Sequence, residues 1–507
     1  MIRIPAATGL VALALTTAAQ ADLTISTAPT RHVTCTAGVC KAGAANAVLN
    51  VDQLTGLLAA GDVTVKPKRL TGLVVAAPIT WANASSLTFE VLPYYKPLTI
   101  AAPIVVEGTG GLSITAWDLL YRPGGRIDFW DTSSQLAVEA GISFGKYTLV
   151  NDLAALAAAV ASNPSGHYAL ARDYDAGGDG TYSGSVVSTT FDGSFQGLGH
   201  TVSNLSLGGS GDVGLFANAS GNAGLSDVRL QNVNILAGVK SHVGALVGSF
   251  RGRIYGASSS GSVTAGDNCI CGGLAGSGHF VWGGGQPATI ARSSSSAAVT
   301  VNRHGVVGGL AGSAGAVTLS HATGNIVFGP HSITGGLLAF PEDQVLQSWA
   351  SGNQTPRHPG FAHSSGGLLG LSRSDTRVAY SYSMGSVMSG GDKTRIGGFI
   401  AELSGGPIEQ SYSVSPVLAP DEASRHHRGS RVGAFLGYTH DETIVSDYWD
   451  IDTSGMTKAC GNRCDGIVGL HDAQLKAHLP DGFDTTYWAQ SPSINNGYPY
   501  LIDNPPE

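Results

Sequence analysis

The chain has 507 residues and a formal net charge of −8, and only 13% of its side chains are charged. An acidic, sparsely charged surface argues against nucleic acid or an anionic membrane as a partner. Apolar residues make up 43% of the chain, which argues against disorder, and the 71 glycines are about twice the usual share.

Residues 1–21 have the composition of a secretory signal peptide. Arg3 precedes an apolar stretch centred on residues 10–15, and Ala19-Gln20-Ala21 ends the segment before Asp22. The apolar stretch is shorter than the roughly 20 residues of a membrane-spanning helix, and no later run reaches that length. We therefore expect an exported mature chain that does not span a membrane. An uncleaved N-terminal anchor is the alternative.

Residues 22–145 contain a duplication with a shift of 25 residues. Residues 76–79 (AAPI) return at 101–104, and the pattern of residues 87–89 returns at 112–114. Two matches at one period predict strands stacked by successive coils, whereas a plain β-sandwich has no reason to keep a period. Within this region Val51–Ala60 has leucines at helical spacing and ends at Gly61, which predicts a helix that covers part of the coil.

Residues 146–210 form a lead-in segment with a second predicted helix. Asn151 is the expected N-cap, Leu153, Leu156 and Val160 lie at helical spacing, and Pro164 is the expected stop.

Three carboxylates of the lead-in lie close together and are weak calcium candidates: Asp173, Asp175 and Asp179. Their spacing is not that of an EF-hand, because Gly177 and Gly184 take the fifth and twelfth ligand positions. A solvated acidic loop is the simpler interpretation.

Residues 211–450 carry a stronger repeat. Its cores are VGLFA, GALVG, GGLAG, GGLAG, GGLLA, GGLLG, GGFIA and GAFLG, and they begin at Val213, Gly244, Gly272, Gly308, Gly335, Gly366, Gly397 and Gly433. The third residue of each core is a large apolar one, which we expect to point into a shared core: Leu215, Leu246, Leu274, Leu310, Leu337, Leu368, Phe399 and Phe435. The small residues beside it leave room for neighbouring backbones.

A serine, often followed by an aromatic residue, comes after most cores. Examples are Ser348-Trp349, Ser381-Tyr382 and Ser411-Tyr412, each three residues after an aliphatic one. Stacked at about 4.8 Å, such positions would form ladders of hydroxyls and of rings. Exposed rings among Trp349, Tyr382 and Tyr412 are candidates for ligand contact, although packing within the ladder is the more common role.

Six cysteines form three close pairs: Cys35 with Cys40, Cys269 with Cys271, and Cys460 with Cys464. In an exported chain we expect disulfides at the first and last pairs. Zinc is the alternative use of close thiols, but no paired histidines accompany them. A bridge between Cys269 and Cys271 would be strained, because residues two apart in a strand face the same side, and their state stays open.

The repeat resembles the GLUG repeat of bacterial surface proteins. The resemblance rests on GGLxG followed by aliphatic-x-x-Ser-aromatic, on the lead-in from Tyr168, and on the closing segment 451–507 with Asn495-Asn496-Gly497-Tyr498-Pro499. It covers Tyr168 to Leu501, about two thirds of the chain. It implies an all-β fold, a right-handed parallel β-helix with one or two short helices flanking or capping it, at a bacterial surface, as in filamentous-haemagglutinin-like adhesins.

The functional expectation is therefore a secreted or surface-exposed adhesin-like protein that binds glycans or proteins of host or neighbouring cells, with no cofactor. The alternative is a polysaccharide-degrading lyase or glycosidase on the same scaffold. That activity needs clustered carboxylates on one face, whereas the acids of the repeats are scattered singly, and no catalytic residue is assigned. Two further motifs are read as loops: the glycine motif of residues 209–214, which no helix is expected to follow, and the charged insertion around His426 and His427.

Overall fold

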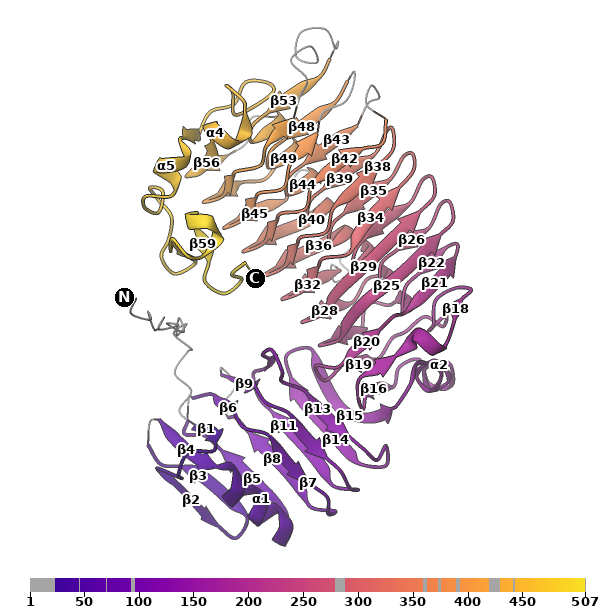
Figure 1. Cartoon of the computed structure of the whole chain (residues 1–507), viewed down its shortest axis with the longest axis vertical. Coiled ribbons are helices and arrows are strands. Elements are labelled where there is room, and N and C mark those ends of the chain that lie inside the picture. Colours follow the sequence, from indigo (N-terminus) through magenta and orange to yellow (C-terminus); the bar gives the residue numbers. More distant parts are fainter. Residues whose placement is uncertain are drawn as a thin grey trace, which may run out of the picture. The chain divides into compact units, whose positions relative to one another are not determined.

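The structure is a computed structural model that describes residues 23–44, 46–69, 71–92, 96–278, 288–358, 363–372, 375–388, 393–418, 429–440 and 443–506. The described chain is mostly β, with long parallel sheets in a solenoid-like, all-β fold (Figure 1). It forms two compact units: unit 1 holds Met1–Arg126 and Ala137–Gly141, and unit 2 holds Ile127–Leu136 and Ile142–Glu507. No helix within the described ranges is long and apolar enough to span a membrane.

Unit 1 has the predicted 25-residue period. β7 (Ile79–Trp81) pairs in parallel with β10 (Ile104–Val106), and β8 (Ser86–Glu90) pairs in parallel with β11 (Gly111–Thr115). The other strands that lie wholly in this unit are β1 (Leu23–Ser26), β2 (Val33–Thr36), β3 (Val39–Ala42), β4 (Ala47–Asn50), β5 (Val63–Lys66), β6 (Leu73–Val75), β9 (Pro97–Ile100) and β12 (Asp118–Tyr121). The recurring segments of the sequence are thus neighbouring turns of one coil.

The first predicted helix is confirmed, and the second needs one correction. α1 (Val51–Ala60) has the predicted bounds, and the Asn50 side chain accepts the N–H of Gln53 as its N-cap. α2 (Leu153–Ser162) is capped by Asp152 and not by Asn151, because the Asp152 carboxylate accepts the N–H of Ala155 at 2.7 Å. A carboxylate at this position satisfies a helical N–H that has no partner within the helix.

Unit 2 is a stack of parallel strands in three sheets. The eight-stranded sheet takes its strands from the starts of the eight repeat cores: β22 (Asp212–Val213), β26 (His242–Val243), β30 (Ile270–Gly272), β35 (Val306–Gly308), β39 (Ile333–Gly335), β43 (Ser364–Gly366), β48 (Arg395–Gly397) and β53 (Arg431–Gly433). Their register aligns each core with the next, as in Gly308 opposite Gly335 and Gly366 opposite Gly397. Each repeat therefore supplies one rung, although the spacing between cores varies from 27 to 36 residues.

A second sheet of unit 2 has 18 strands. They are β17 (Tyr174–Asp175), β18 (Thr181–Tyr182), β20 (Thr201–Ser203), β21 (Ser206–Gly209), β25 (Arg229–Ala237), β29 (Ser258–Ala265), β33 (Ser294–Ser295), β34 (Ala298–Val301), β37 (His321–Ala322), β38 (Ile326–Phe328), β41 (Trp349–Ala350), β42 (Gln354–Pro356), β46 (Tyr382–Ser383), β47 (Val387–Met388), β51 (Tyr412–Ser413), β52 (Val417–Leu418), β56 (Asp447–Asp450) and β57 (Ile467–Leu470).

The third sheet completes each rung. In unit 2 its strands are β15 (Ser143–Val150), β16 (His167–Leu170), β19 (Ser194–Gln196), β23 (Phe216–Ala219), β24 (Gly224–Ser226), β27 (Val247–Phe250), β28 (Arg253–Tyr255), β31 (Ala275–Gly278), β32 (Thr289–Ala291), β36 (Ala311–Thr318), β40 (Leu338–Leu346), β44 (Leu369–Leu371), β45 (Arg377–Ala379), β49 (Ile400–Leu403), β50 (Ile408–Glu409), β54 (Leu436–Thr439) and β55 (Ile444–Val445). After the stack come α4 (Ile451–Ser454), α5 (Asp472–Leu475), and the antiparallel pair β58 (Trp488–Ala489) and β59 (Tyr500–Leu501). β13 (Ile127–Phe129) also belongs to unit 2, and β14 (Gln135–Ala140) runs across the boundary between the units.

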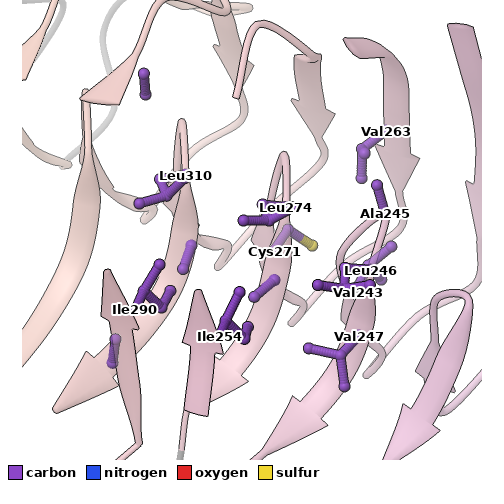
Figure 2. Close-up of a cluster of buried hydrophobic side chains, with 14 of the residues drawn as sticks. Val243, Ala245, Leu246, Val247, Ile254, Val263, Cys271, Leu274, Ile290 and Leu310 are labelled. Carbon is purple, nitrogen blue, oxygen red and sulfur yellow. The ribbon is translucent and has the colours of Figure 1, made fainter. Parts of the chain in front are cut away.

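The core of unit 2 is built from the third residues of the repeat cores. All eight are completely buried, as predicted. Figure 2 shows Leu246, Leu274 and Leu310 in a row on successive rungs, with Ile254 and Ile290 packed in the same interior. Stacking similar apolar side chains at the strand spacing buries each against its neighbours, which makes the stack self-supporting.

The glycines of the cores permit close contact between rungs. A Cβ on Gly336 would lie 2.0 Å from the carbonyl oxygen of Gly367, and a Cβ on Gly367 would lie 1.9 Å from that of Gly398. Any side chain at these positions would overlap the next rung, so glycine is required by packing.

A buried ladder of serines joins the rungs at one corner. The backbone N–H of Ser320 donates to the hydroxyl of Ser348, that of Ser348 to Ser381, and that of Ser381 to Ser411, at 3.2, 3.3 and 3.2 Å. The residue before each of these serines has a positive φ: Leu319 at 51°, Gln347 at 49°, Tyr380 at 50° and Gln410 at 48°. The left-handed bend turns the chain from one sheet to the next, and the serine satisfies a buried N–H that the turn leaves unpaired.

Candidate functional site

One outward-facing position of the 18-stranded sheet changes in character along the stack, and we call it the ladder column. From Thr201 to Tyr448 the register places nine residues in it, in order: Thr201, Arg229, Ser258, Ser294, His321, Trp349, Tyr382, Tyr412 and Tyr448. Large rings occupy the later rungs, and small hydroxyl side chains occupy two rungs before His321.

The rings of the later rungs stack. The ring centroids of His321 and Trp349 are 4.4 Å apart with planes inclined by 3°, those of Trp349 and Tyr382 are 5.6 Å apart at 8°, and those of Tyr382 and Tyr412 are 5.1 Å apart at 5°. The predicted aromatic ladder is therefore present. Offset stacking of this kind adds to the burial energy of each ring.

The C-terminal residues 472–506, which we call the C-terminal cover, pack on this ladder. Trp349 donates its indole N–H to the Asn504 carbonyl at 3.0 Å, and Tyr412 donates its hydroxyl to the Pro499 carbonyl at 2.6 Å. The Asn504 amide donates to the carbonyls of Ser320 and Gln347 at 3.2 and 2.9 Å. Phe483 and Trp488 also pack in this cluster.

The prediction that Trp349, Tyr382 and Tyr412 contact a ligand is wrong in this conformation. Trp349 is 3% exposed, and Tyr382 and Tyr412 are completely buried. Burial raises the pKa of both tyrosines well above the ordinary value. The three rings are packing residues, because the C-terminal cover occupies the face on which a ligand would lie.

A groove of about 310 Å³ lies where the ring ladder stops. Arg229 and His321 lie toward its ends, and Ser258 and Ser294 lie between them in the ladder column. The groove exists because these two rungs carry serine where the later rungs carry a ring. Its volume is near the lower end of the range of ligand pockets, about 300–1,000 Å³.

The groove is polar, and its described lining residues include no carboxylate. Besides the column residues, its lining includes Gln231, Ser260, Ser296 and Thr323. Ser259 and Ser295 lie beneath it and face inward, where the Ser259 hydroxyl donates to the Gly273 carbonyl at 2.9 Å and lies at hydrogen-bonding distance, 3.0 Å, from the Ser295 hydroxyl, which can donate to it. The hydroxyls of Ser259 and Ser295 thus make hydrogen bonds below the groove. The hydroxyls of Ser258 and Ser294 point outward and face the groove.

Sequence reasoning did not find Arg229, Ser258, Ser294 or His321. The signal was present: each occupies the position of the aromatic residue in the serine-aromatic pair, one or more rungs earlier. Alignment by strand register, rather than by residue type, would have placed them together with Trp349.

Two carboxylates approach a buried histidine at the N-terminal side of the groove. His200 is completely buried, and its Nδ1 lies 3.4 Å from an Asp173 oxygen and 3.8 Å from an Asp128 oxygen. Its Nε2 lies 2.7 Å from the Ile127 carbonyl, which requires an N–H at Nε2. Asp173 also accepts the backbone N–H of Thr201 at 2.8 Å, so this cluster is joined to the groove lining.

The predicted calcium site does not form. Asp175 accepts N–H groups from Gly177 and Asn204, and Asp179 accepts the hydroxyls of Tyr174 and Tyr182, so the carboxylates serve separate local contacts. The hydrogen bond to Asp179 and, above all, burial raise the pKa of Tyr174 to about 12. In the part of the chain that the structure describes, no three histidine, cysteine or acidic side chains gather as metal ligands.

The cysteines fall into two classes. Cys35 with Cys40, and Cys460 with Cys464, lie at disulfide-bonding distance, as the sequence predicted. Cys269 and Cys271 are free and buried. A hydrogen bond with Cys271 lowers the pKa of Cys269 to about 7, whereas burial raises that of Cys271 well above its ordinary value.

Two other motifs of the sequence remain, the glycine motif of residues 209–214 and the charged insertion around His426 and His427, and the structure describes the first of them. Residues 209–214 span the end of β21, a turn and β22, with a strand rather than a helix at its end, so a phosphate-binding turn is not formed. His426 and His427 lie outside the described residues.

Comparison with known proteins shows little similarity to this chain. No known protein family matches the chain, and no curated protein matches it. Among solved structures, a protein from Bacteroides ovatus provisionally named an immunoglobulin A1 protease is similar over 66% of this chain and 86% of its own, with 15% identity and a TM-score of 0.30.

Proposed function

We propose that this chain is a secreted or surface-exposed bacterial adhesin-like protein. In this proposal its stacked rungs are a right-handed parallel β-helix of GLUG-type repeats, similar to filamentous-haemagglutinin-like adhesins. Its signal-like N-terminus directs export, and the outward flank of unit 2 binds glycans or proteins of host or neighbouring cells.

The observation that carries the proposal is the groove on the 18-stranded sheet. Five successive rungs line it with hydroxyl, amide, imidazole and guanidinium groups, and no carboxylate is among the lining residues that the structure describes. Hydroxyls both donate and accept hydrogen bonds, so such a lining complements a ligand that is itself rich in hydroxyls. A groove of this kind suits retention of a glycan, whereas glycoside hydrolysis needs a pair of carboxylates beside the scissile bond.

The test is a glycan array that scores retention and product release by the purified full chain, beside binding to cells and matrix proteins. The informative variant is Ser294→Tyr, which would continue the ring ladder onto His321 and fill the groove. Its matched control is Thr300→Tyr, a half-buried position on the same rung outside the groove lining. We expect retention by wild type and by the control, and loss of glycan retention by Ser294→Tyr. Failure of the wild-type chain to retain any cell, matrix protein or glycan would refute the function.

A second candidate, polysaccharide cleavage, is favoured by one observation. Asp173 and Asp128 approach His200 beside Thr201, and the Asp173 side chain is 57% exposed. Two carboxylates near a bound sugar are the usual requirement of glycoside hydrolysis. This candidate requires release of shortened products by the wild-type chain and their loss in Asp173→Asn.

A further inference from the structure

We infer that the groove is specific for a carboxylate-bearing saccharide of about two sugar residues, with the carboxylate on Arg229 and a sugar ring on His321. This inference rests on the proposed function and goes further by naming the ligand class. It follows from the charge, the span and the ring face that the groove offers.

One side chain of the groove lining, that of Arg229, carries a positive charge. Among the described residues of the lining, Arg229 is the one arginine or lysine, and none of them is acidic. In the described part of the chain its guanidinium makes one hydrogen bond, from Nη1 to the Gly199 carbonyl at 2.5 Å, and it makes no ion pair. The remaining N–H groups are therefore available for a planar carboxylate, which a guanidinium binds through two parallel hydrogen bonds.

The position of Arg229 favours an ion pair that contributes to affinity. Its side chain is half-buried rather than fully exposed, and it is held by the Gly199 carbonyl. A charge that is already held loses little side-chain entropy on binding. Partial desolvation also strengthens its attraction to a ligand anion relative to a surface pair.

The opposite end of the groove provides a ring face. His321 is stacked on Trp349 with nearly parallel planes, so its other face is turned toward Ser294 and the groove. The hydrogen bond between His321 Nδ1 and Asn504 Oδ1, at 3.0 Å, fixes the plane of the imidazole. A fixed ring face at the end of a polar groove accepts the apolar face of a sugar ring.

The span fits a short saccharide. Arg229 and His321 are separated by three register steps through Ser258 and Ser294, which is about 14 Å at the usual inter-strand distance. This distance and the volume of about 310 Å³ suit a disaccharide, with serine hydroxyls beside the sugar hydroxyls between the two ends.

The C-terminal cover shows that this flank accepts extended polar material. Asn504 lies against His321 and bonds the carbonyls of Ser320 and Gln347, on the last rung of the groove and at the rung that follows it. The groove is the uncovered continuation of that surface, and a ligand in it would end against Asn504.

The experiment is isothermal titration of the full chain with four matched disaccharides: neutral, uronate, methyl-esterified uronate and sulfated. We expect the uronate to bind at least about tenfold more tightly than its methyl ester, the size expected for one charge-assisted contact. Arg229→Gln should remove this preference. Arg253→Gln, an exposed arginine on β28 outside the groove, is the matched control and should behave as wild type.

Arg229→Lys guards against a folding defect, because it keeps a donor for Gly199 but not the planar fork. It should retain the wild-type melting temperature and only part of the uronate preference. Equal binding of the uronate and its ester, or tighter binding of the sulfated sugar, would overturn the ligand assignment while leaving adhesion intact. Retention of cells or matrix proteins without binding of any of these sugars would overturn it in the same way.

Discussion

The backbone N–H of Ser411 donates to the buried carboxylate of Asp447 at 2.8 Å, where the five preceding rungs, from Ser293 to Ser411, offer a serine hydroxyl. The second oxygen of Asp447 accepts the N–H of Val445 at 3.1 Å. The serine ladder thus ends on an acid.

Replacing one ladder serine should destabilise unit 2. Ser348→Ala leaves the buried N–H of Ser320 without its acceptor, which should lower the free energy of unfolding by about 1–3 kcal/mol. Thermal or urea unfolding followed by circular dichroism measures this change. Ser351→Ala, two strand positions beyond Trp349, is the control and should stay within about 0.5 kcal/mol of wild type. Equal stability of the two variants would mean that the ladder contributes nothing.

The acid at the end of the ladder should make stability depend on pH. Burial raises the pKa of Asp447 well above its ordinary value, against the opposing effect of the two N–H donors. Because the pKa of Asp447 is raised in the folded state, the contribution of its protonated carboxyl to stability is complete below the pKa of the unfolded chain, which is about 4. It is lost as the pH rises through the folded pKa.

Asp447→Ser restores the hydroxyl of the other rungs and removes this titration. The difference in melting temperature between the variant and wild type should therefore grow in favour of the variant from pH 4 to pH 8. Asp343→Ser, an exposed acid of the stack, is the control and should follow the wild-type profile. A difference that stays constant with pH would contradict the assignment.

A methyl group at a core glycine should disturb two rungs. In Gly367→Ala the new Cβ would lie 1.9 Å from the carbonyl oxygen of Gly398, so backbone must shift, at a cost of about 1–3 kcal/mol or more. Gly221→Ala has no atom within 4 Å of its Cβ and serves as the control. We expect a lower melting temperature for Gly367→Ala and a wild-type melting temperature for Gly221→Ala. Wild-type melting temperatures for both variants would show that the rungs can move apart at no cost in stability.

The C-terminal cover should open when its anchor is removed. Asn504→Ala deletes the amide bonds to Ser320 and Gln347, which should increase the rate of limited proteolysis within residues 472–506 about tenfold or more. Trp349 would then gain exposure, visible as a red shift of its fluorescence. Asp503→Ala changes the neighbouring exposed residue and should leave both readouts at wild-type values.

Much of the fold was predictable because its determinants are periodic. The large third residue of each core, such as Leu274 or Phe435, recurs in the same short motif, and all eight can be buried together only if the rungs stack in register. The 25-residue shift of unit 1 and the bounds of α1 followed from equally local patterns.

The candidate site was not predictable in the same way. The groove depends on serine at Ser258 and Ser294, and serine is common throughout the chain, so these two gain meaning only from the register. The sequence predicted correctly that the rings of Trp349, Tyr382 and Tyr412 form a ladder. Their role as ligand contacts required exposed rings, whereas the structure buries them. No periodic signal indicates that the segment around Asn504 packs more than 150 residues away in sequence on Trp349.

The parallel stacking of unit 2 has a mechanical consequence. Hydrogen bonds between rungs, such as that from Ser320 to Ser348, connect successive strands, so a pulling force applied across the stack is borne by one rung interface after another in series. A solenoid loaded in this way yields at its weakest interface. The C-terminal cover contacts the rungs of His321, Trp349, Tyr412 and Tyr448, so it carries part of the load across those interfaces in parallel. Under tension, the uncovered rungs between Arg229 and Ser294 should therefore be the first to separate.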